Sequence, residues 1–337
     1  AIIPQGIKSG DDLRWLRKFW EVPPCLEGWD YCQTAVGESC HYGGLHMVVD
    51  WRTGGRGMVR PRVDCKALGK LGIGVTQTGA HRATLYLGTR FDSNIAPIVP
   101  LDPADLPAIW AYVSSSDYPE ALKRLSPGLF TTNSTFLKVE FDRASWEAVA
   151  AEKYPDGLPE PESDYPTQWL FHGRPDEARE GTELQVAVAR LLGYRWLAEL
   201  DDKMCLSKRA RALVKKCGEL AKFADGDGIV CIPPVGGEPS AADRLHNLLA
   251  KAFGVGWNKD KLNELLKRAD HGGKTLETWL REKFFIQHCQ LFHHRPFIWH
   301  IWDGLRDGFS VLVNYHKLDH KNLETLIYTY LGDWIKR

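Results

Sequence analysis

The fold of the C-terminal part depends on the stretch Phe297-Ile298-Trp299-His300-Ile301-Trp302, followed shortly by Phe309-Ser310-Val311-Leu312-Val313-Asn314-Tyr315. Aromatic and branched side chains alternate along both runs, and Asp307-Gly308 between them is typical of a tight turn. This pattern predicts a β-hairpin over residues 296–316 with one face in the core. Aromatic cross-strand pairs stabilise a hairpin by about 0.2 to 1 kcal/mol each, so a structural role is the default interpretation for most of these residues.

Upstream of the hairpin, the chain is rich in Lys, Arg, Glu and Leu at helical spacing. The segments with the apolar period of amphipathic helices are residues 182–192, 207–220, 240–253, 259–269 and 275–285. Residues 228–232 read as a short buried strand. We therefore expect a mainly helical region over residues 171–337 that contains the hairpin.

The first 170 residues have a different composition, with Gly-rich and Pro-rich turns between short β-like runs. The expected strands are residues 48–51, 72–78, 82–87 and 136–141. Asp102-Pro103 is typical of a helix start, and a second short helix is expected around 120–125. Five prolines among acidic residues mark 154–175 as a linker. The fold class predicted is α+β: a mixed-sheet domain over residues 1–170, then the helical region.

The composition restricts the possible functions. The 337 residues are 44% hydrophobic and 26% charged, as in ordinary globular proteins, and no apolar run approaches membrane-spanning length. We expect a cytoplasmic protein with reduced cysteines and no membrane partner. Lys plus Arg and Asp plus Glu balance at 43 each, so a nucleic-acid site must be a local patch. The first residue is not Met and a helical pattern runs to the last residue, so we expect a piece of a longer protein.

Several patterns that could carry chemistry are weak. The glycine-rich stretches 54–57 and 69–74 lack the Lys-Ser/Thr ending of a phosphate loop. The spacing of His288, Cys289, His293, His294 and His300 fits no standard zinc finger. Carboxylates at 140–142 and 199–203 could belong to a metal nuclease but are typical of solvated faces. We expect no catalytic residue and no metal ligand in this chain.

Cations concentrate in one N-terminal stretch of low acidity, which begins at Arg52 and extends through Lys70. Arginine pairs with guanine edges and phosphates, and glutamine pairs with adenine. The candidate DNA contacts are Lys8, Arg14, Arg56, Arg60, Arg62, Lys66, Thr76, Gln77, Thr78, His81 and Arg82. A second basic group consists of His293, His294 and Arg295.

Several motifs, in this order, resemble a known family. They are Gly6-Ile7-Lys8-Ser9-Gly10-Asp11-Asp12 with Phe19-Trp20-Glu21-Val22, Phe171-His172-Gly173-Arg174-Pro175, Asp227-Gly228-Ile229-Val230-Cys231-Ile232-Pro233, and the run from His293 to Asp319 closed by Tyr330-Leu331-Gly332-Asp333-Trp334. The chain resembles the target-recognition half of large N6-adenine DNA methyltransferases, the class of the Eco57I-like enzymes and the BREX and DISARM phage-defence methylases. Ser9 stands where the family has Thr, and Asp12 where it has Asn.

The resemblance implies a division of labour. In this class the S-adenosylmethionine motifs and the Asn-Pro-Pro-aromatic turn lie N-terminal to the recognition region, so the cofactor belongs to the parent enzyme and not to this segment. The parent would methylate adenine N6 in a specific duplex site, and this portion would read that site. The implied partners are double-stranded DNA, the N-terminal methyltransferase domain and other defence-system subunits. The alternative is a helical interaction module that docks partner subunits; nuclease activity of the parent is left open.

Overall fold

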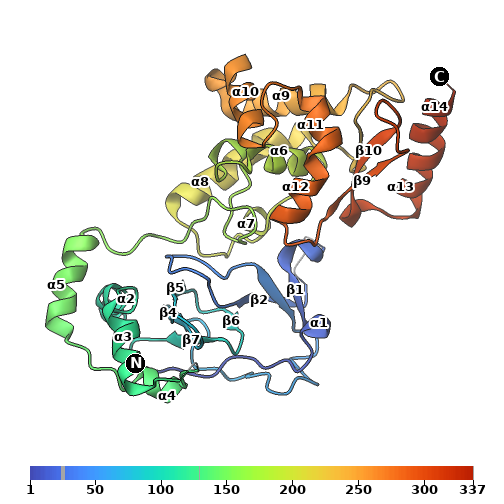
Figure 1. Ribbon diagram of the computed structural model, residues 1–337. Helices are drawn as coiled ribbons and strands as arrows, with labels where there is room; N and C mark the ends of the chain where they lie inside the picture. The colour runs from blue at the N-terminus through green and yellow to red at the C-terminus, as the bar shows by residue number, and fades with distance from the viewer. Residues whose placement is uncertain (24–26, 129, 337) are drawn as a thin grey trace. The chain divides into compact units, whose positions relative to one another are not determined.

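The computed structural model describes residues 1–23, 27–128 and 130–336, and the chain divides into two units (Figure 1). Unit 1 consists of Ala1–Phe19 and Leu26–Pro161, and unit 2 of Trp20–Cys25 and Glu162–Arg337. The main division falls after residue 161, inside the proline-rich stretch 154–175, whereas the composition predicts the boundary after residue 170. The observed architecture confirms an α+β fold, with sheets in the N-terminal part and helices plus a hairpin in the C-terminal part.

Unit 1 contains two small sheets. The first is mixed: its strands follow the order β1-β3-β2-β6, and only the β2–β6 pair is parallel. Its members are β1 (Leu16–Lys18), β2 (Trp29–Gln33), β3 (Met47–Asp50) and β6 (Arg90–Phe91). The second is antiparallel in the order β5-β4-β7, with β4 (Gly72–Thr76), β5 (Ala83–Tyr86) and β7 (Ile95–Ile98). Buried Gln33 links the sheets by donating to the carbonyls of Gly43 and Leu85.

Helices cover the antiparallel sheet. The helices of unit 1 are α1 (Asp12–Trp15), α2 (Leu106–Val113), α3 (Asp117–Leu125), α4 (Asn133–Phe136) and α5 (Arg143–Lys153). Asp102 caps the turn that leads into α2, as its sequence predicts, by accepting from the Ala104 N–H at 2.9 Å. Ile73 and Val75 of β4 pack with Trp110 of α2 in the main core of this unit. That core holds the antiparallel sheet against α2, and the long loop between β3 and β4 leads into this sheet.

The strand predicted over 136–141 is wrong. Phe136 is buried, but it ends the short helix α4, and residues 137–141 form turns and irregular chain. Asp142 then caps α5 by accepting from the Ser145 N–H. The apolar side chains of Val139 and Phe141 pack on the core individually, without a neighbouring strand. The alternation of apolar and polar residues over 136–141 therefore arises because Val139 and Phe141 each contact the core, and not because the segment is a strand.

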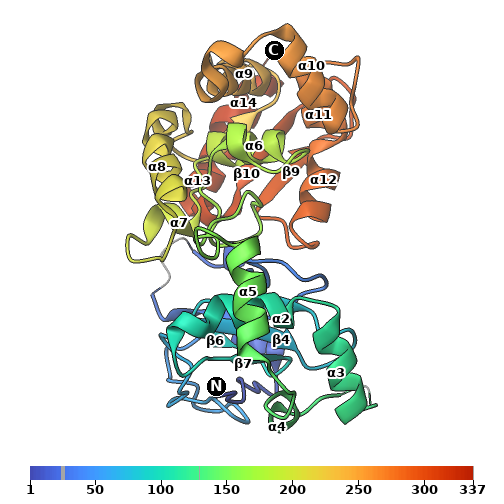
Figure 2. The same ribbon diagram turned by 90° about the vertical axis from the view of Figure 1, so that its left-hand side faces the viewer.

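Unit 2 is built around one buried helix. All nine residues of α6 (Glu183–Leu191) are buried, and both ribbon views show it at the centre of the unit (Figure 1, Figure 2). The surrounding helices are α7 (Leu197–Leu200), α8 (Lys208–Cys217), α9 (Ala241–Phe253), α10 (Lys259–Arg268), α11 (Leu276–Glu282) and α12 (Phe284–Leu291). The predicted segment 275–285 is thus divided between α11 and α12.

The hairpin exists, but its environment differs from the prediction. Strands β9 (Ile298–Trp302) and β10 (Ser310–Asn314) pair antiparallel, and β8 (Ile229–Cys231) pairs with the other side of β10. Because β10 is the central strand, all five of its residues are buried, whereas Trp299, Ile301 and Trp302 of β9 are exposed. The connection is residues 303–309, not a two-residue turn. The Asp303 carboxylate holds it by accepting from the Leu305 and Phe309 N–H groups.

A terminal helical segment covers one face of this sheet. It consists of α13 (His320–Glu324), a π-helical stretch Thr325–Leu331 and α14 (Gly332–Ile335). Leu326 and Tyr330 pack on Val311 and Val313 of β10. The predicted helix after the hairpin is therefore confirmed. It packs as a layer on one face of the sheet formed by β8, β10 and β9.

His288 is an interior group of unit 2. It is fully buried, its Nε2 accepts from the Ile298 N–H at 3.3 Å, and its Nδ1 lies 3.2 Å from the Gln185 carbonyl oxygen, to which it donates. Phe284, Phe292 and Phe297 surround the ring. Burial lowers the pKa of His288 to about 3. The side chain is thus a neutral bridge between α6, α12 and β9, and is closed to a metal ion.

We predict that acid destabilises unit 2 through this residue. Unfolding exposes His288 to water, where its pKa returns to about 6.5, so the unfolded state binds the extra proton. The contribution of neutral His288 to the free energy of unfolding is therefore fully present above pH 6.5. Below that pH the free energy of unfolding falls by about 1.4 kcal/mol per pH unit towards pH 3, so the loss at pH 5 is about 2 kcal/mol. Urea unfolding at pH 7 and pH 5 measures this loss. His288→Gln should reduce the pH dependence, whereas His320→Gln, at a histidine side chain 88% exposed, should not; equal slopes would contradict the assignment.

Among the described residues there is neither a disulfide bond nor a membrane-spanning helix. The seven cysteines among them, Cys32, Cys40, Cys65, Cys205, Cys217, Cys231 and Cys289, are all free thiols. No helix within the described ranges is both long enough and apolar enough to cross a bilayer.

Candidate nucleic-acid interface

The predicted cations of unit 1 gather on two adjoining segments. The N-terminal segment pairs with the loop between β3 and β4 through reciprocal main-chain bonds between Lys8 and Arg60, at 3.0 and 2.9 Å. Arg62 donates to the Gln5 side chain, and Arg60 donates to the Gly6 carbonyl at 3.3 Å. Figure 1 shows this segment and this loop along the same edge of unit 1. We call Lys8, Arg56, Arg60, Arg62, Lys66 and Lys70 the basic loop surface.

Tight turns shape this loop. Gly55 has a φ of +76°, and a side chain there would meet Pro61 and Trp51. Arg62 has a φ of +55°, a left-handed conformation uncommon for a residue with a Cβ. The backbone of this loop therefore turns tightly, which places Arg56, Arg60 and Arg62 close together along it.

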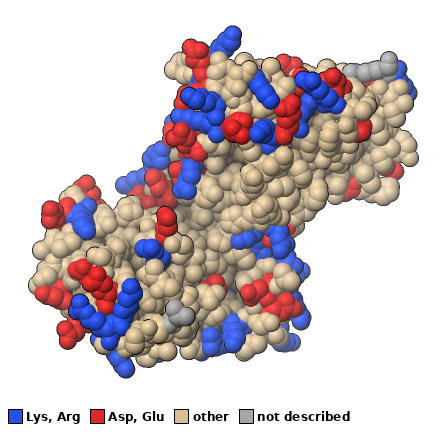
Figure 3. Space-filling model, viewed as in Figure 1, with Lys and Arg blue, Asp and Glu red and all other residues tan. Residues whose placement is uncertain are grey.

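The cations of this region differ in how far they are neutralised. Arg52 forms an ion pair with Asp50 and Arg14 packs over the Trp15 ring, 4.7 Å from its centroid. The side chains of Lys8, Arg56, Lys66 and Lys70 are exposed and form no hydrogen bond or ion pair with any described residue. Figure 3 shows blue side chains on either side of a red group in the region of α1 and its neighbouring loops. Four exposed cations without an ion pair to any described residue thus lie on the basic loop surface.

Three predicted contacts are supports of the fold. Thr76, Gln77 and His81 are buried. His81 lies between the Thr76 carbonyl, 3.0 Å from Nδ1, and the Thr131 hydroxyl, 3.2 Å from Nε2, while the Gln77 side chain donates to Asn133. The side chains of Gln77 and His81 bond within unit 1, and the Thr76 hydroxyl is buried without a hydrogen-bond partner among the described residues, so none of the three lies at the surface where a DNA contact is expected. They hold the β4–β5 turn, on which Thr78 and Arg82 are exposed.

Asn133 is a residue that the sequence prediction missed. Its side-chain amide donates to the carbonyls of Ile3, at 3.1 Å, and Pro4, at 2.8 Å, and its oxygen accepts from Gln77. It therefore ties the β4–β5 turn to the N-terminal segment that carries Lys8. A single asparagine in a Ser/Thr-rich stretch carries no sequence signal for this role.

A polar hollow of about 320 Å³ adjoins Lys8. Its lining includes Ser9, Asp12, Asp92 and Asn94, and the Ser9 hydroxyl donates to Asp12. Burial raises the pKa of Asp92, whose carboxylate accepts from the Asn94 N–H at 2.8 Å. Carboxylate and amide oxygens accept from the amino groups of cytosine and adenine in the major groove. The hollow can therefore supply acceptors beside the cations.

The second basic group lies in unit 2, at the end of α12. His293 and His294 are exposed, with left-handed φ angles of +54° and +58°. Arg295 is partly neutralised by Glu21, whose carboxylate lies 3.1 Å away, and its carbonyl accepts from the Trp20 ring N–H. This group belongs to unit 2 and is anchored by the segment 20–23, so the structure does not assign it to the basic loop surface.

The glycine-rich stretches do not form a cofactor cradle. Gly72 and Gly74 lie inside β4, where a side chain on either would collide with β7. Gly54, Gly55 and Gly57 turn the basic loop, which leads to β4 and not to a helix N-terminus. Neither stretch fits S-adenosylmethionine, whose binding loop joins a strand to a helix. Among the described residues, no group of three or more His, Cys, Asp or Glu side chains is placed to hold a metal ion.

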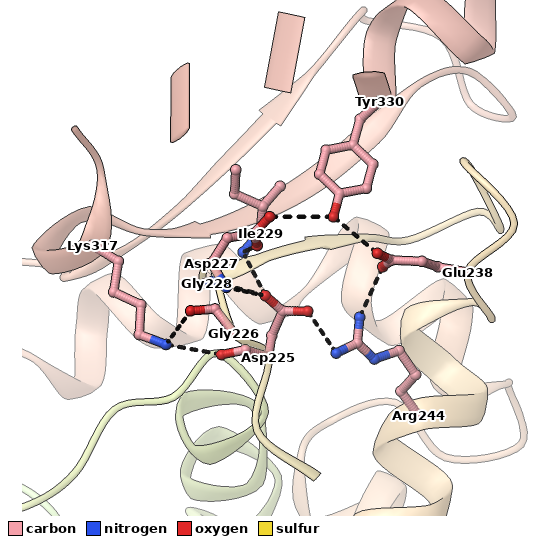
Figure 4. A network of polar contacts seen from close by, with 9 residues as sticks. All are labelled: Asp225, Gly226, Asp227, Gly228, Ile229, Glu238, Arg244, Lys317 and Tyr330. Atoms are coloured by element: carbon pink, nitrogen blue, oxygen red, sulfur yellow. Dashed lines mark hydrogen bonds and ion pairs between the residues drawn. The ribbon is translucent and has the colours of Figure 1, made fainter. Parts of the chain in front are cut away.

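A carboxylate cluster in unit 2 is the other polar site (Figure 4). Asp225 accepts from the N–H groups of Asp227, Gly228 and Ile229 and forms an ion pair with Arg244 at 2.7 Å. Tyr330 donates to Glu238 at 3.0 Å. Burial and the adjacent Asp225 raise the pKa of Asp227 to about 6.

The bonds of this cluster indicate a structural clamp. Lys317 donates to the carbonyls of Asp225 and Gly226, at 2.8 and 3.3 Å, so its ammonium is not directed at a ligand. Tyr330 joins the terminal helical segment to the loop before β8. The block Asp227-Gly228-Ile229 therefore serves to close the fold of unit 2.

Comparison with models of protein families and with curated proteins found no match for this chain.

Proposed function

We propose that this chain is the DNA-reading portion of an N6-adenine DNA methyltransferase of a restriction-modification or phage-defence system. The observation that carries the proposal is the basic loop surface, where exposed cations without acidic partners follow one folded loop and the adjoining N-terminal segment. In a chain of balanced charge, such a local excess is what phosphate binding requires. The resemblance of the motifs supplies the class of enzyme.

Within this proposal, the cations position the duplex and the polar groups beside them read it. Phosphate contacts fix register, while sequence is read by groups that reach base edges. Asp12, Asp92 and Asn94 of the hollow, with Thr78 and Arg82 of the β4–β5 turn, are the polar groups available for the second task. Methyl transfer and S-adenosylmethionine binding would belong to the methyltransferase domain of the parent, the second proposed partner.

A salt titration of duplex binding tests the proposal. We expect the full chain to bind a duplex with an affinity that falls linearly with the logarithm of salt concentration, with a slope of about −0.9 for each phosphate contacted. Fluorescence anisotropy with a labelled 30-base-pair duplex, between 50 and 300 mM NaCl, gives that slope. An acidic polypeptide of similar charge serves as competitor control. Absence of binding at every salt concentration would contradict the proposal.

The second candidate function is docking of partner subunits by the helical region. It is favoured by the exposed aromatic side chains of β9, Trp299 and Trp302, which are 50% and 55% exposed. Absence of duplex binding at low salt would leave this candidate as the better one. The two functions use different units, so one chain can combine them.

A further inference from the structure

Strand β9 is an unpaired edge of the three-stranded sheet β8-β10-β9. The main-chain bonds from Asp303 to Phe309 and from Tyr315 to Phe297 flank the ladder. Bonded and non-bonded pairs alternate in an antiparallel ladder, so the pairs Ile301–Val311 and Trp299–Val313 carry its hydrogen bonds. The main-chain groups of His300 and Trp302 therefore point away from β10, towards the open edge.

This edge lacks the usual protection against pairing. Natural edge strands carry lysine, proline, an inward charge or a bulge. The five residues of β9 are Ile298-Trp299-His300-Ile301-Trp302 and carry none of these, and its register with β10 is unbroken. No described residue bonds to the outward main-chain groups of His300 or Trp302. Only Ile298 is satisfied on that side, by His288.

A groove runs beside this edge. It has a volume of about 700 Å³, and its apolar walls are Phe285 and Ile286 of α12 with Trp302 and Leu305 of the hairpin. His300 and Trp302 face it from the strand, and the His300 ring donates to or accepts from the Ser310 hydroxyl at 2.7 Å. Figure 3 shows few charged side chains over α12 and β9 in unit 2. A strand added at the edge would direct alternate side chains into this groove.

The charges of the groove decide between a peptide and a nucleic acid. Three carboxylates line it, Glu277, Glu282 and Asp307, against the two cations Arg281 and Arg306. Glu277 is paired with Arg281 at 3.1 Å and Glu282 with Lys274 at 3.2 Å, and Arg281 also donates to the Gly308 carbonyl at 3.2 Å. Arg306, beside Asp307, is then the one lining cation without an ion pair among the described residues, so a phosphate chain would meet no excess of positive charge. An extended peptide needs no such excess, because the outward main-chain groups of His300 and Trp302 can pair with its backbone.

We propose that the β9 edge and this groove bind an extended segment of a partner protein, with apolar side chains at alternate positions, as an added β-strand. Main-chain bonds to His300 and Trp302 would supply affinity, and apolar side chains at alternate positions would fill the groove. The site uses neither the cations of unit 1 nor any DNA contact. An experiment that finds no peptide binding at β9 would therefore leave the duplex-binding proposal standing, and the reverse also holds.

Selection from a displayed library of random ten-residue peptides on the full chain tests this proposal. We expect enriched peptides with apolar residues at alternate positions. Hydrogen exchange of the His300 and Trp302 amides should slow when an enriched peptide binds. Trp302→Lys, which puts a cation on the edge, should raise the Kd at least about tenfold, as for a central anchor residue. Val255→Lys, at a fully exposed valine of unit 2, should leave it unchanged.

Three outcomes would overturn the proposal. One is a library that yields no enriched peptide, and another is an enriched peptide whose affinity is the same for Trp302→Lys as for the unchanged chain. The third is slower exchange of these two amides with rising protein concentration alone, or on addition of an oligonucleotide. That result would assign the edge to a second copy of the chain or to nucleic acid.

Discussion

Neutralising four cations of the basic loop surface should reduce duplex affinity roughly a thousandfold at 0.1 M salt, because each lost phosphate contact removes about 0.9 from the salt slope. The variant combines Lys8→Gln, Arg56→Gln, Arg62→Gln and Lys66→Gln. All four side chains are exposed, and none has an acidic partner among the described residues. Fluorescence anisotropy over a range of salt concentrations measures both the affinity and the slope, which should become shallower by about 3.6.

A matched variant separates this surface from the overall charge. Lys123→Gln, Arg124→Gln, Lys138→Gln and Lys153→Gln remove the same four charges from exposed positions on and near the helices of unit 1. If duplex binding depends only on net charge, both variants lose affinity equally, and the basic loop surface is not the interface. If the surface is the interface, the matched variant keeps most of its affinity. Thermal unfolding of both variants checks that unit 1 is intact.

The basic loop surface shows what a sequence can predict about a site. Charge density along residues 52–70 is a local property, so it identified the segment on which the free cations lie. Burial of Gln77 and His81 depends on Asn133 and Thr131, more than 49 residues later in the chain. No local pattern shows which polar side chain meets such a distant partner. The sequence therefore located the exposed cations of this loop, but not the burial of the polar residues Thr76, Gln77 and His81 that follow it.

The hairpin shows the same limit in the fold. Alternation over 297–302 and 309–315 predicted two paired strands correctly, because pairing between neighbours is local. The short buried strand expected over 228–232 exists as β8, but no local pattern predicted that it pairs with β10 from about 80 residues earlier and makes β10 the central strand. Since β8 occupies the far side of β10, β9 becomes the exposed edge. The exposure of its aromatic residues is thus a consequence of topology.

The motif Phe171-His172-Gly173-Arg174-Pro175 has a structural explanation in unit 2. Gly173 has a φ of +87°, and a side chain there would collide with the Glu199 carboxylate and the Arg190 guanidinium. Arg174 forms an ion pair with Asp176 at 2.7 Å and donates to the Ala252 carbonyl at 2.8 Å. Burial, more than any neighbouring charge, lowers the pKa of His172 to about 4. Gly173 of the motif thus lies against the buried ion pair between Arg190 and Glu199, and a glycine is required there because a larger side chain would collide with the pair.

Breaking the buried ion pair between Arg190 and Glu199 should strongly destabilise unit 2. Arg190 and Glu199 lie 2.8 Å apart, and their side chains are only 5% and 4% exposed. Burial lowers the pKa of Arg190 and the Glu199 charge raises it, with a net rise. Glu199→Ala leaves the guanidinium buried without its counter-ion, which costs about 3 to 5 kcal/mol. Urea unfolding followed by tryptophan fluorescence gives the free energy of unfolding.

Two further variants make this result specific. Arg190→Met combined with Glu199→Leu removes both charges, so it should be considerably more stable than Glu199→Ala alone, because no charge then stays buried without a partner. Glu219→Ala breaks the exposed pair with Lys251, whose side chains are 55% and 42% exposed, and should cost less than about 1 kcal/mol. A double variant no more stable than Glu199→Ala would mean that the lost hydrogen bond to the Trp196 N–H, and not the unpaired charge, accounts for the destabilisation.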